Sequence, residues 1–374
     1  MLFIFISYLT FICVINTNHY ILIQMSLTGG TFDFLLFLGN PRKAFFTHID
    51  TIASSSVVQP NSYNPDDSFT SFKHHDNFTE DIVTLSNYSG SKSMTIPFAF
   101  NYSSNSMNSI AMGYNIINQS HSLLYSLYKL NYITSLSFSF IHYKEFSYFC
   151  LGSFPSIMEG GSPCKSLCNV NKHYNHWGCD VSRFGTYSIQ YKDVQNGYGV
   201  INSNEYEVTV PLDVIYEIKE MYFDNLISDG TCEFDINNKH SVFTCDCSIR
   251  YNFPNIDIIL DNKVNITLSG YSLFTSERKH SLCEFIINPT KPSEYYDNRY
   301  TWVLGLKILN KYSIEFDYNN STITFHSNSP SIYVQLPFIP EKDLNNIKLN
   351  MINATSFILI LFTIFISLYK YITP

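Results

Sequence analysis

Charged side chains are scarce in this sequence. They make up 14% of the 374 residues, whereas hydrophobic residues make up 45% and aromatic residues 16%. Intrinsic disorder is excluded, because a disordered chain needs few aromatic residues and a high net charge. The length is enough for two or three domains, or for one large two-lobed domain with a sizeable core.

Basic residues are also few, and they are scattered along the chain. The 23 Lys and Arg residues are outnumbered by 31 Asp and Glu residues, which leaves a formal charge of −8. Nucleic acid is excluded as the main partner, because phosphate binding needs clustered basic side chains. The sequence has no Gly-rich phosphate loop and no Ser-His-Asp nucleophile signature, and we expect no cofactor.

Long apolar runs are confined to the two ends of the chain. The first is Leu2–Ile15 (LFIFISYLTFICVI), which stops at a polar stretch. Its length fits the core of a secretory signal peptide better than a membrane span, so a signal peptide is predicted over residues 1–18. The usual positively charged start is missing, which leaves an uncleaved membrane anchor as the alternative.

The second apolar run is Phe357–Leu368 (FILILFTIFISL). Extended to residues 351–369 it is just long enough to cross a bilayer, and Lys370 after it suits a short cytoplasmic tail. A lipid-anchor signal is the alternative, because this tail is short. We expect a single-pass type I protein of the secretory pathway or cell surface, with residues 331–350 as a stem.

Cysteine is absent between Cys13 and Cys150. Eight cysteines then follow, at positions 150, 164, 168, 179, 232, 245, 247 and 283. An even number in a secretory context favours disulfides, and eight cysteines would form four bridges. Sequons of the form Asn-x-Ser/Thr agree with a luminal or extracellular location. They begin at Asn77, Asn87, Asn101, Asn118, Asn265, Asn319, Asn320 and Asn353.

One cysteine cluster also resembles a metal site. Its spacing, Cys164-x3-Cys168-x4-His173-x2-His176-x2-Cys179, contains enough nitrogen and sulfur ligands for zinc. Disulfides are the favoured interpretation in an oxidising compartment, and we predict no metal site.

Short β-rich runs bounded by turn residues dominate the chain. Strands are predicted at Phe32–Leu38 and Ile256–Leu260, and a hairpin is predicted over Ser313–Phe325. Helical patterns are few, the clearest being Ser120–Leu130 and Pro211–Phe223. These patterns predict a mostly-β protein with a few surface helices.

Two distant segments share one layout. In each, an apolar strand ends in a polar residue followed by a hydroxyl residue, and a later apolar pair is followed by Gly. The first copy is Ile49-Asp50-Thr51 with Ala111-Met112-Gly113, and the second is Val200-Ile201-Asn202-Ser203 with Val303-Leu304-Gly305. The glycines predict a close approach of two backbones.

The order of these and other segments resembles the pepsin-like aspartic proteases, over nearly the whole chain between residues 20 and 330. The segments are FLGNP (37–41), IDTIAS (49–54), YNPDDSFT (63–70), EDIVTL (80–85), SIAMGY (109–114), FSF (138–140), CLG (150–152), the stretch 200–211 and the closing segment 302–325. The resemblance implies a mostly-β, bilobal fold with a central cleft. Its N-terminal lobe would cover residues 20–148 and its C-terminal lobe residues 149–330.

The resemblance also implies a chemistry, in which two facing Asp side chains share one proton and activate a water molecule. Asp50 holds the first position, and the spacing from Pro211 places Asn202 at the second. An amide has no titratable proton and cannot act as a general base, so the paired-acid mechanism is lost. Thr51 and Ser203 hold the hydroxyl positions whose hydrogen bonds brace the two loops in the family.

Other departures from the family concern the loops around the site. Ile52 and Asn204 replace Gly, and we expect Ile52 to hinder backbone N–H groups from reaching the acid. Active relatives carry a hairpin flap with a Tyr over the cleft. Here only Ser71–Thr79 lies between two of the matching segments, so the flap is predicted to be shortened or absent.

Two functions of different classes are consistent with these residues. The first is a membrane-attached pseudoprotease that binds a peptide or protein in a degenerate cleft, with Asp50 hydrogen-bonded to Asn202 and Thr51. The alternative is an active aspartic endopeptidase, acting through an unusual Asp/Asn site or through two N-terminal lobes that pair to supply two Asp50 residues.

Two further expectations concern the C-terminal lobe. Glu205 or Glu207 would have to enter the cleft to replace the missing acid, but strand alternation turns Glu205 away from the face of Asn202. The resemblance also implies a disulfide in this lobe, from Cys245 or Cys247 to Cys283.

Overall fold

The computed structural model describes residues 20–28, 31–73, 78–86, 93–103, 107–114, 122–143, 146–155, 165–172, 176–186, 190–237, 241–275, 281–291 and 300–326. The chain divides into two units, Met1–Ser329 and Pro330–Pro374, and the second lies outside the described residues. The predicted signal peptide, stem and membrane segment also lie outside them and stay predictions. No helix in the described ranges is long and apolar enough to span a membrane.

Strands dominate the described chain, which confirms the predicted mostly-β fold. The largest sheet in the described residues has thirteen strands, in the order β11-β23-β22-β9-β10-β1-β2-β3-β8-β4-β7-β6-β5. These strands are β1 (Tyr20–Thr28), β2 (Thr31–Leu38), β3 (Lys43–Asp50), β4 (Val57–Val58), β5 (Phe72–Lys73), β6 (Phe78–Ser86), β7 (Ser93–Tyr102), β8 (Ser109–Ala111), β9 (Ser137–Tyr143), β10 (Phe146–Gly152), β11 (Lys165–Asn169), β22 (Ser313–Asp317) and β23 (Thr322–His326).

The second sheet belongs to the later part of the chain. In the described ranges it has seven strands in the order β18-β17-β12-β13-β21-β14-β20, and a smaller sheet has the order β15-β16-β19. The strands are β12 (Gly178–Thr186), β13 (Gln190–Ile201), β14 (Val208–Val210), β15 (Cys232–Phe234), β16 (Phe243–Asp246), β17 (Ile256–Leu260), β18 (Val264–Leu268), β19 (Leu282–Glu284), β20 (Ile287–Pro289) and β21 (Thr301–Leu304).

Helices are short and few among the described residues. They are α2 (Leu123–Lys129), α3 (Leu212–Ile218), α4 (Asp224–Ser228) and α5 (Leu306–Leu309), with a π-helix η5 (Lys219–Phe223) and 3-10 turns η1 (Pro65–Asp67), η6 (Cys247–Tyr251) and η7 (Gly270–Leu273). Both predicted helices are confirmed. The first begins after its N-cap Ser122, and the second follows Pro211 and continues through the π-helix to Ser228.

The predicted internal repeat is confirmed by the strand pairing. In the first copy β3 runs parallel to β8, β8 antiparallel to β4, and β4 parallel to β7. In the second copy β13 runs parallel to β21, β21 antiparallel to β14, and β14 parallel to β20. The two copies therefore form two lobes of the same topology, with Asp50 and Asn202 at the ends of the corresponding strands β3 and β13.

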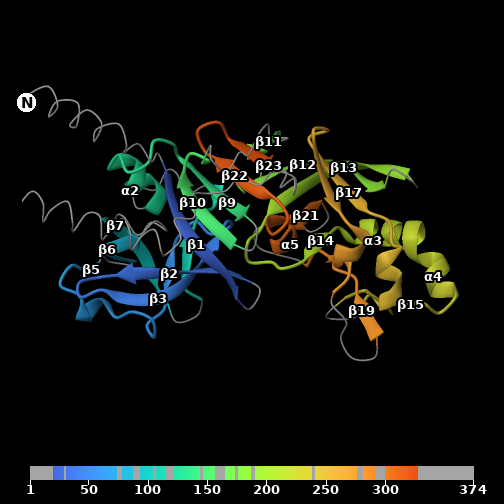
Figure 1. Cartoon of the computed structure of the whole chain (residues 1–374), viewed down its shortest axis with the longest axis horizontal. Coiled ribbons are helices and arrows are strands. Elements are labelled where there is room, and N and C mark those ends of the chain that lie inside the picture. Colours follow the sequence, from blue (N-terminus) through green and yellow to red (C-terminus); the bar gives the residue numbers. More distant parts are fainter. Residues whose placement is uncertain are drawn as a thin grey trace, which may run out of the picture. The chain divides into compact units, whose positions relative to one another are not determined.

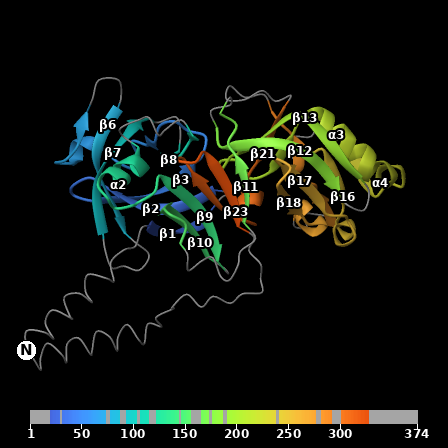
Figure 2. The same ribbon diagram turned by 90° about the horizontal axis from the view of Figure 1, so that it is seen from above.

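Six antiparallel strands of the large sheet join the beginning of the described chain to its end. β1 pairs with β10, β10 with β9, β9 with β22, β22 with β23 and β23 with β11. The closing strand β22 accordingly lies beside β9, and β23 lies on the other side of β22 (Figures 1 and 2). The expected lobe boundary between residues 148 and 149 falls inside β10, which pairs with both β1 and β9, and the boundary stays a prediction.

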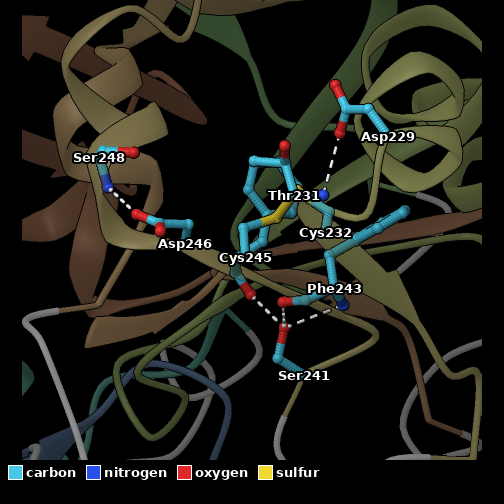
Figure 3. The surroundings of a disulfide bond; sticks show 9 residues. Asp229, Thr231, Cys232, Ser241, Phe243, Cys245, Asp246 and Ser248 are labelled. Carbon is cyan, nitrogen blue, oxygen red and sulfur yellow. Dashed lines mark hydrogen bonds between the residues drawn. A yellow bond between two sulfur atoms is a disulfide. The ribbon is translucent and has the colours of Figure 1, made fainter. Parts of the chain in front are cut away.

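The described cysteines form three disulfides, Cys168–Cys179, Cys232–Cys245 and Cys247–Cys283. The implied bond to Cys283 is confirmed, with Cys247 as the partner. Figure 3 shows Cys232–Cys245 together with Asp229, in the turn after α4, and Asp246, the last residue of β16. The expectation that all eight cysteines pair is wrong, because Cys150 is a buried free thiol; Cys164 lies outside the described residues.

The zinc alternative loses two of its ligands to the Cys168–Cys179 disulfide, because disulfide sulfurs cannot act as thiolate ligands. No cluster of three or more His, Cys, Asp or Glu side chains in the described ranges could hold a metal ion.

Candidate active site

Asp50 ends strand β3, whose inner face packs in the core. Ile49 is 1% exposed, whereas the Asp50 side chain is half-buried. Its Oδ1 atom accepts two backbone hydrogen bonds, from the N–H groups of Ile52 and Ala53, both at 2.9 Å. These two backbone donors fix the orientation of the Asp50 side chain at the end of β3.

Ile52 does not disturb this loop, and the expectation that it would is wrong. The N–H group of Ile52 reaches the carboxylate at an ordinary distance. Neither Ile52 nor Asn204 is among the residues with a positive φ. Glycine is required only where φ is positive or where space is lacking, and neither condition applies to the backbone at Ile52.

Asn202 follows β13 and occupies the position that corresponds to Asp50. Its side chain is buried, at 7% exposure, and its Oδ1 accepts a hydrogen bond from the N–H of Asn204 at 2.9 Å. This bond to residue i+2 repeats the bond between Asp50 and Ile52. The predicted hydrogen bonds from Asp50 to Asn202 and Thr51 are absent among the described residues, because each side chain bonds to its own loop.

Thr51 and Ser203 join the two loops through a symmetric set of hydrogen bonds, here called the cross-brace. Thr51 Oγ1 donates to the carbonyl of Ile201 at 2.8 Å and accepts from the N–H of Ser203 at 3.0 Å. Ser203 Oγ donates to the carbonyl of Ile49 at 2.6 Å and accepts from the N–H of Thr51 at 3.1 Å. Both side chains are almost fully buried, at 0% and 2% exposure. The cross-brace therefore holds Asp50 and Asn202 in adjacent loops.

The two repeated glycines lie where the backbone of each lobe passes close to its own loop. A Cβ on Gly113 would lie 2.5 Å from the carbonyl oxygen of Ala53. A Cβ on Gly305 would clash with the carbonyl oxygens of Glu205 and Glu207. The predicted close approach is thus confirmed in both lobes, and it explains why no side chain fits there.

Two aromatic side chains of the second lobe fix the segment behind the Asp50 loop. The N–H of Met112 donates to the carbonyl of Asp50 at 2.7 Å. The carbonyl of Met112 in turn accepts from Trp177 Nε1 at 2.7 Å and from the Tyr318 hydroxyl at 3.0 Å. Trp177 and Tyr318 are buried against each other, with ring centroids 4.6 Å apart. Neither residue was predicted, because a single aromatic residue gives no sequence signal for such a contact.

His48 is the titratable residue nearest to Asp50 along β3. It is buried, and it faces Asp33 across the β2–β3 pair. Burial lowers the pKa of His48, while the carboxyl groups of Asp50 and Asp33 act in the opposite direction. The imidazole is therefore held largely neutral near neutral pH.

A long hairpin, formed by β6 and β7, begins at the end of the stretch Ser71–Thr79. Strands β6 and β7 pair over their whole length, from Phe78↔Asn101 to Ser86↔Ser93. Their connection, residues 87–92, lies outside the described residues and contains Tyr88. The length of Ser71–Thr79 therefore says nothing about the length of this hairpin. It does not support the prediction of a shortened or absent flap.

Neither nearby glutamate replaces the missing acid. Glu205 is exposed. Glu207 is half-buried and its Oε2 accepts from Asn288 Nδ2 at 2.7 Å, while burial raises the pKa of its carboxyl group. In the described residues neither glutamate side chain hydrogen-bonds to the side chain of Asp50 or of Asn202.

Comparison with known proteins agrees with this geometry. Residues 171–328 match the family model described as eukaryotic aspartyl protease. The match covers less than half of the chain but includes Asn202, Ser203 and strands β12 to β23. No curated protein matches the chain. The two lobes of equal topology, joined by the cross-brace, have the mostly-β pepsin-like aspartic protease fold.

Proposed function

We propose that this chain is a membrane-attached pepsin-like pseudoprotease, which binds a peptide or protein in its degenerate cleft without cutting it. The observation that carries the proposal is Asn202. It occupies the position that corresponds to Asp50 across the cross-brace, at the end of the equivalent strand.

The chemistry of the pair explains why this one residue decides the proposal. Peptide hydrolysis by two carboxylates needs one protonated and one ionised group, which exchange a proton with the attacking water. The amide of Asn202 offers a donor and an acceptor but no titratable proton. Asp50 alone can accept a proton from water, but no partner acid protonates the substrate.

The intact surroundings support a retained binding role. The cross-brace, the two close-packed glycines and the backbone donors to Asp50 all remain. A peptide can bind an exposed strand edge through backbone hydrogen bonds without any catalysis. The proposal therefore assigns the cleft to recognition of an extended peptide or protein segment.

An active aspartic endopeptidase is the second candidate, and one observation favours it. Asp50 is retained at the end of β3, and two backbone donors at 2.9 Å hold its side chain in a fixed orientation. Activity would then use an Asp/Asn pair or two chains that each supply an Asp50.

A cleavage assay on the purified full chain tests the proposal. A mixture of peptides is incubated from about pH 3 to about pH 7, the range over which a carboxylate pair titrates. The natural chain is compared with Asp50→Ala, Asn202→Asp and the neighbouring control Asn204→Asp. We expect cleavage only in Asn202→Asp. Cleavage by the natural chain that disappears in Asp50→Ala would instead establish the endopeptidase.

Binding is measured separately, since absence of cleavage alone does not show recognition. The inactive natural chain is immobilised, and the bound peptides of the same mixture are identified by mass spectrometry. We expect a reproducible subset of peptides to be retained, and retention to survive in the matched control Asn204→Asp. Loss of all retention above an unrelated control protein would contradict the binding role.

Membrane attachment and luminal orientation rest on the apolar run of residues 351–369 and on the three disulfides, which indicate an oxidising compartment. The test is alkaline extraction of membranes that contain the full chain or a chain ending at residue 350. We expect the full chain to stay in the membrane pellet and the shortened chain to be released. Release of both would contradict the anchor.

A further inference from the structure

The structure indicates which of the described sequons can carry an N-linked glycan. Three disulfides indicate an oxidising compartment, and in the luminal location proposed above, on which this inference rests, sequon asparagines receive glycans. Among the described residues, four sequons begin, at Asn101, Asn265, Asn319 and Asn320. A folded chain tolerates a glycan only where the side-chain amide points to solvent and no essential contact depends on it.

Two of these amides are already engaged in the fold. Asn101 is half-buried in β7, and its Nδ2 donates to Ser55 Oγ at 2.9 Å. Asn320 closes the β22–β23 turn, where its Nδ2 donates to Asp317 Oδ2 at 2.6 Å. A glycan on either nitrogen would replace one of its hydrogens and crowd the partner.

Asn265 lies on the outward face of β18. Its neighbours Val264 and Ile266 are buried, whereas Asn265 is exposed, and no hydrogen bond of its side chain is recorded in the described chain. The hydroxyl that its sequon requires belongs to Thr267, which donates to Asp257 at 2.6 Å. The alternation of the strand therefore presents the Asn265 amide to solvent.

Strand β18 is also the edge of its sheet. Among described strands only β17 pairs with it. The outer edge is covered at Thr267, whose N–H donates to the Tyr312 hydroxyl at 2.9 Å and whose carbonyl accepts from Lys311. Backbone direction repeats every two residues, so the N–H and carbonyl of Asn265 point to the same outer edge. Unprotected edges of this kind invite pairing with another chain.

Asn319 lies at the tip of the β22–β23 turn. It is exposed, one residue before the engaged Asn320. Its sequon ends in Ser321, whose Oγ accepts from the Tyr114 hydroxyl at 2.9 Å. A glycan on Asn319 leaves the turn and this contact unchanged.

We propose that Asn265 and Asn319 carry N-linked glycans, whereas Asn101 and Asn320 do not. In the transfer step the amide nitrogen attacks the anomeric carbon of a lipid diphosphate-linked oligosaccharide. A C–N bond forms, the C–O bond to the lipid diphosphate breaks, and the amide gives up one proton. The glycan on Asn265 lies beside the part of the β18 edge that Tyr312 and Lys311 leave uncovered, and there it blocks strand addition by a second copy.

The test uses the full chain produced in a eukaryotic secretory host and purified with its glycans. Peptide N-glycosidase converts each glycosylated Asn to Asp, and digestion in heavy-oxygen water marks these positions for mass spectrometry. We expect the label at Asn265 and Asn319 and none at Asn101 or Asn320. Label at Asn101, or its absence from both Asn265 and Asn319, would overturn the proposal.

Variants separate the modification from folding. Asn265→Gln and Asn319→Gln should each remove one glycan step on a denaturing gel, and the matched Asn101→Gln should remove none. Asn265→Gln is preferred to a change at Thr267, because that hydroxyl also binds Asp257. We expect Asn265→Gln, and not Asn319→Gln, to increase self-association. An unchanged distribution would overturn the edge-protection role. None of these readouts depends on peptide cleavage, so their failure is distinguishable from failure of the proposed function.

Discussion

Removing one hydroxyl of the cross-brace should destabilise the whole two-lobed fold. Thr51→Val keeps the shape of the side chain but deletes Oγ1. The carbonyl of Ile201 and the N–H of Ser203 then lose their partners in a site with almost no solvent. Each buried polar group left unsatisfied costs about 1–3 kcal/mol, so the expected loss is about 2–6 kcal/mol.

The second arm of the test is Ser203→Ala, which removes the same kind of bonds from the carbonyl of Ile49 and the N–H of Thr51. The two hydroxyls also lie 3.3 Å apart, so they share one network. Residues in one hydrogen-bond network show interaction energies of about 0.5–3 kcal/mol. We therefore expect the double variant to lose less than the sum of the two single losses.

The assay is urea unfolding of the full chain, monitored by tryptophan fluorescence. Trp177 packs behind the Asp50 loop and reports on this region. Ser54→Ala is the control, because Ser54 lies in the same loop but is exposed. A loss below about 0.5 kcal/mol for Thr51→Val, which is the range of ordinary surface substitutions, would refute the idea that the cross-brace holds the lobes together.

The remaining predictions concern single residues, and each is checked by urea unfolding of the full chain. Burial lowers the pKa of His142 to about 4, so its folded form binds fewer protons than the unfolded chain. The free energy of unfolding should then fall by about 1.4 kcal/mol per pH unit between about pH 6 and about pH 4, and His142→Gln should flatten this slope. A slope that His142→Gln leaves unchanged would contradict the assignment. Gly305→Ala should destabilise the chain by about 1–3 kcal/mol, because its Cβ would clash with two backbone carbonyls that cannot move independently; an unchanged urea midpoint would show that the loop relaxes freely. Trp177→Phe should cost about 1–3 kcal/mol by leaving the carbonyl of Met112 short of one donor, and a loss equal to that of an exposed aromatic substitution would contradict it.

Much of the fold could be predicted because its signals are local. Strands such as Ile256–Leu260 alternate or fill with apolar residues and end at turn residues, and the structure gives the same bounds. The repeated glycines Gly113 and Gly305 are a short sequence pattern that predicts a contact between distant segments, since only a residue without Cβ fits a close backbone approach. These two positions allowed the close backbone approach in each lobe to be predicted, whereas the bilobal fold was implied by the resemblance to the pepsin-like aspartic proteases.

The errors arose where a residue's role depends on three-dimensional context. Ile52 was assigned a disruptive effect from its residue type, but the loop there has no positive φ, so Gly is not needed. The even number of cysteines predicted that Cys150 is disulfide-bonded. That number says nothing about which sulfur atoms lie close together, and Cys150 is a free thiol. The contacts of Trp177 and Tyr318 with Met112 join segments that are far apart in sequence, and no periodicity marks them.

A last prediction follows from the symmetry of the two loops. Asn202 Oδ1 accepts from residue i+2 at the same 2.9 Å as Asp50 Oδ1, so an Asp at position 202 would take the same orientation without rearrangement. The substitution would place a second carboxyl group in a buried position beside the loop of Asp50. Burial and a neighbouring like charge both raise the pKa of one carboxyl group of such a pair.

A raised folded pKa makes the effect of Asn202→Asp depend on pH. The protonated acid is neutral and resembles the amide, so the variant should match the natural chain in stability at about pH 4. The carboxyl group introduced at position 202 ionises at a lower pH in the unfolded chain than in the folded chain. Between these two pKa values the variant should therefore lose unfolding free energy, by about 1.4 kcal/mol per unit of pKa shift. Unfolding free energies of both chains at about pH 4 and about pH 7 check this. An equal deficit at both values would mean that Asn202 is retained for packing. A deficit confined to neutral pH would show that the fold still accepts a second acid at position 202. The natural chain would then differ from a paired-acid site only in lacking a titratable proton there.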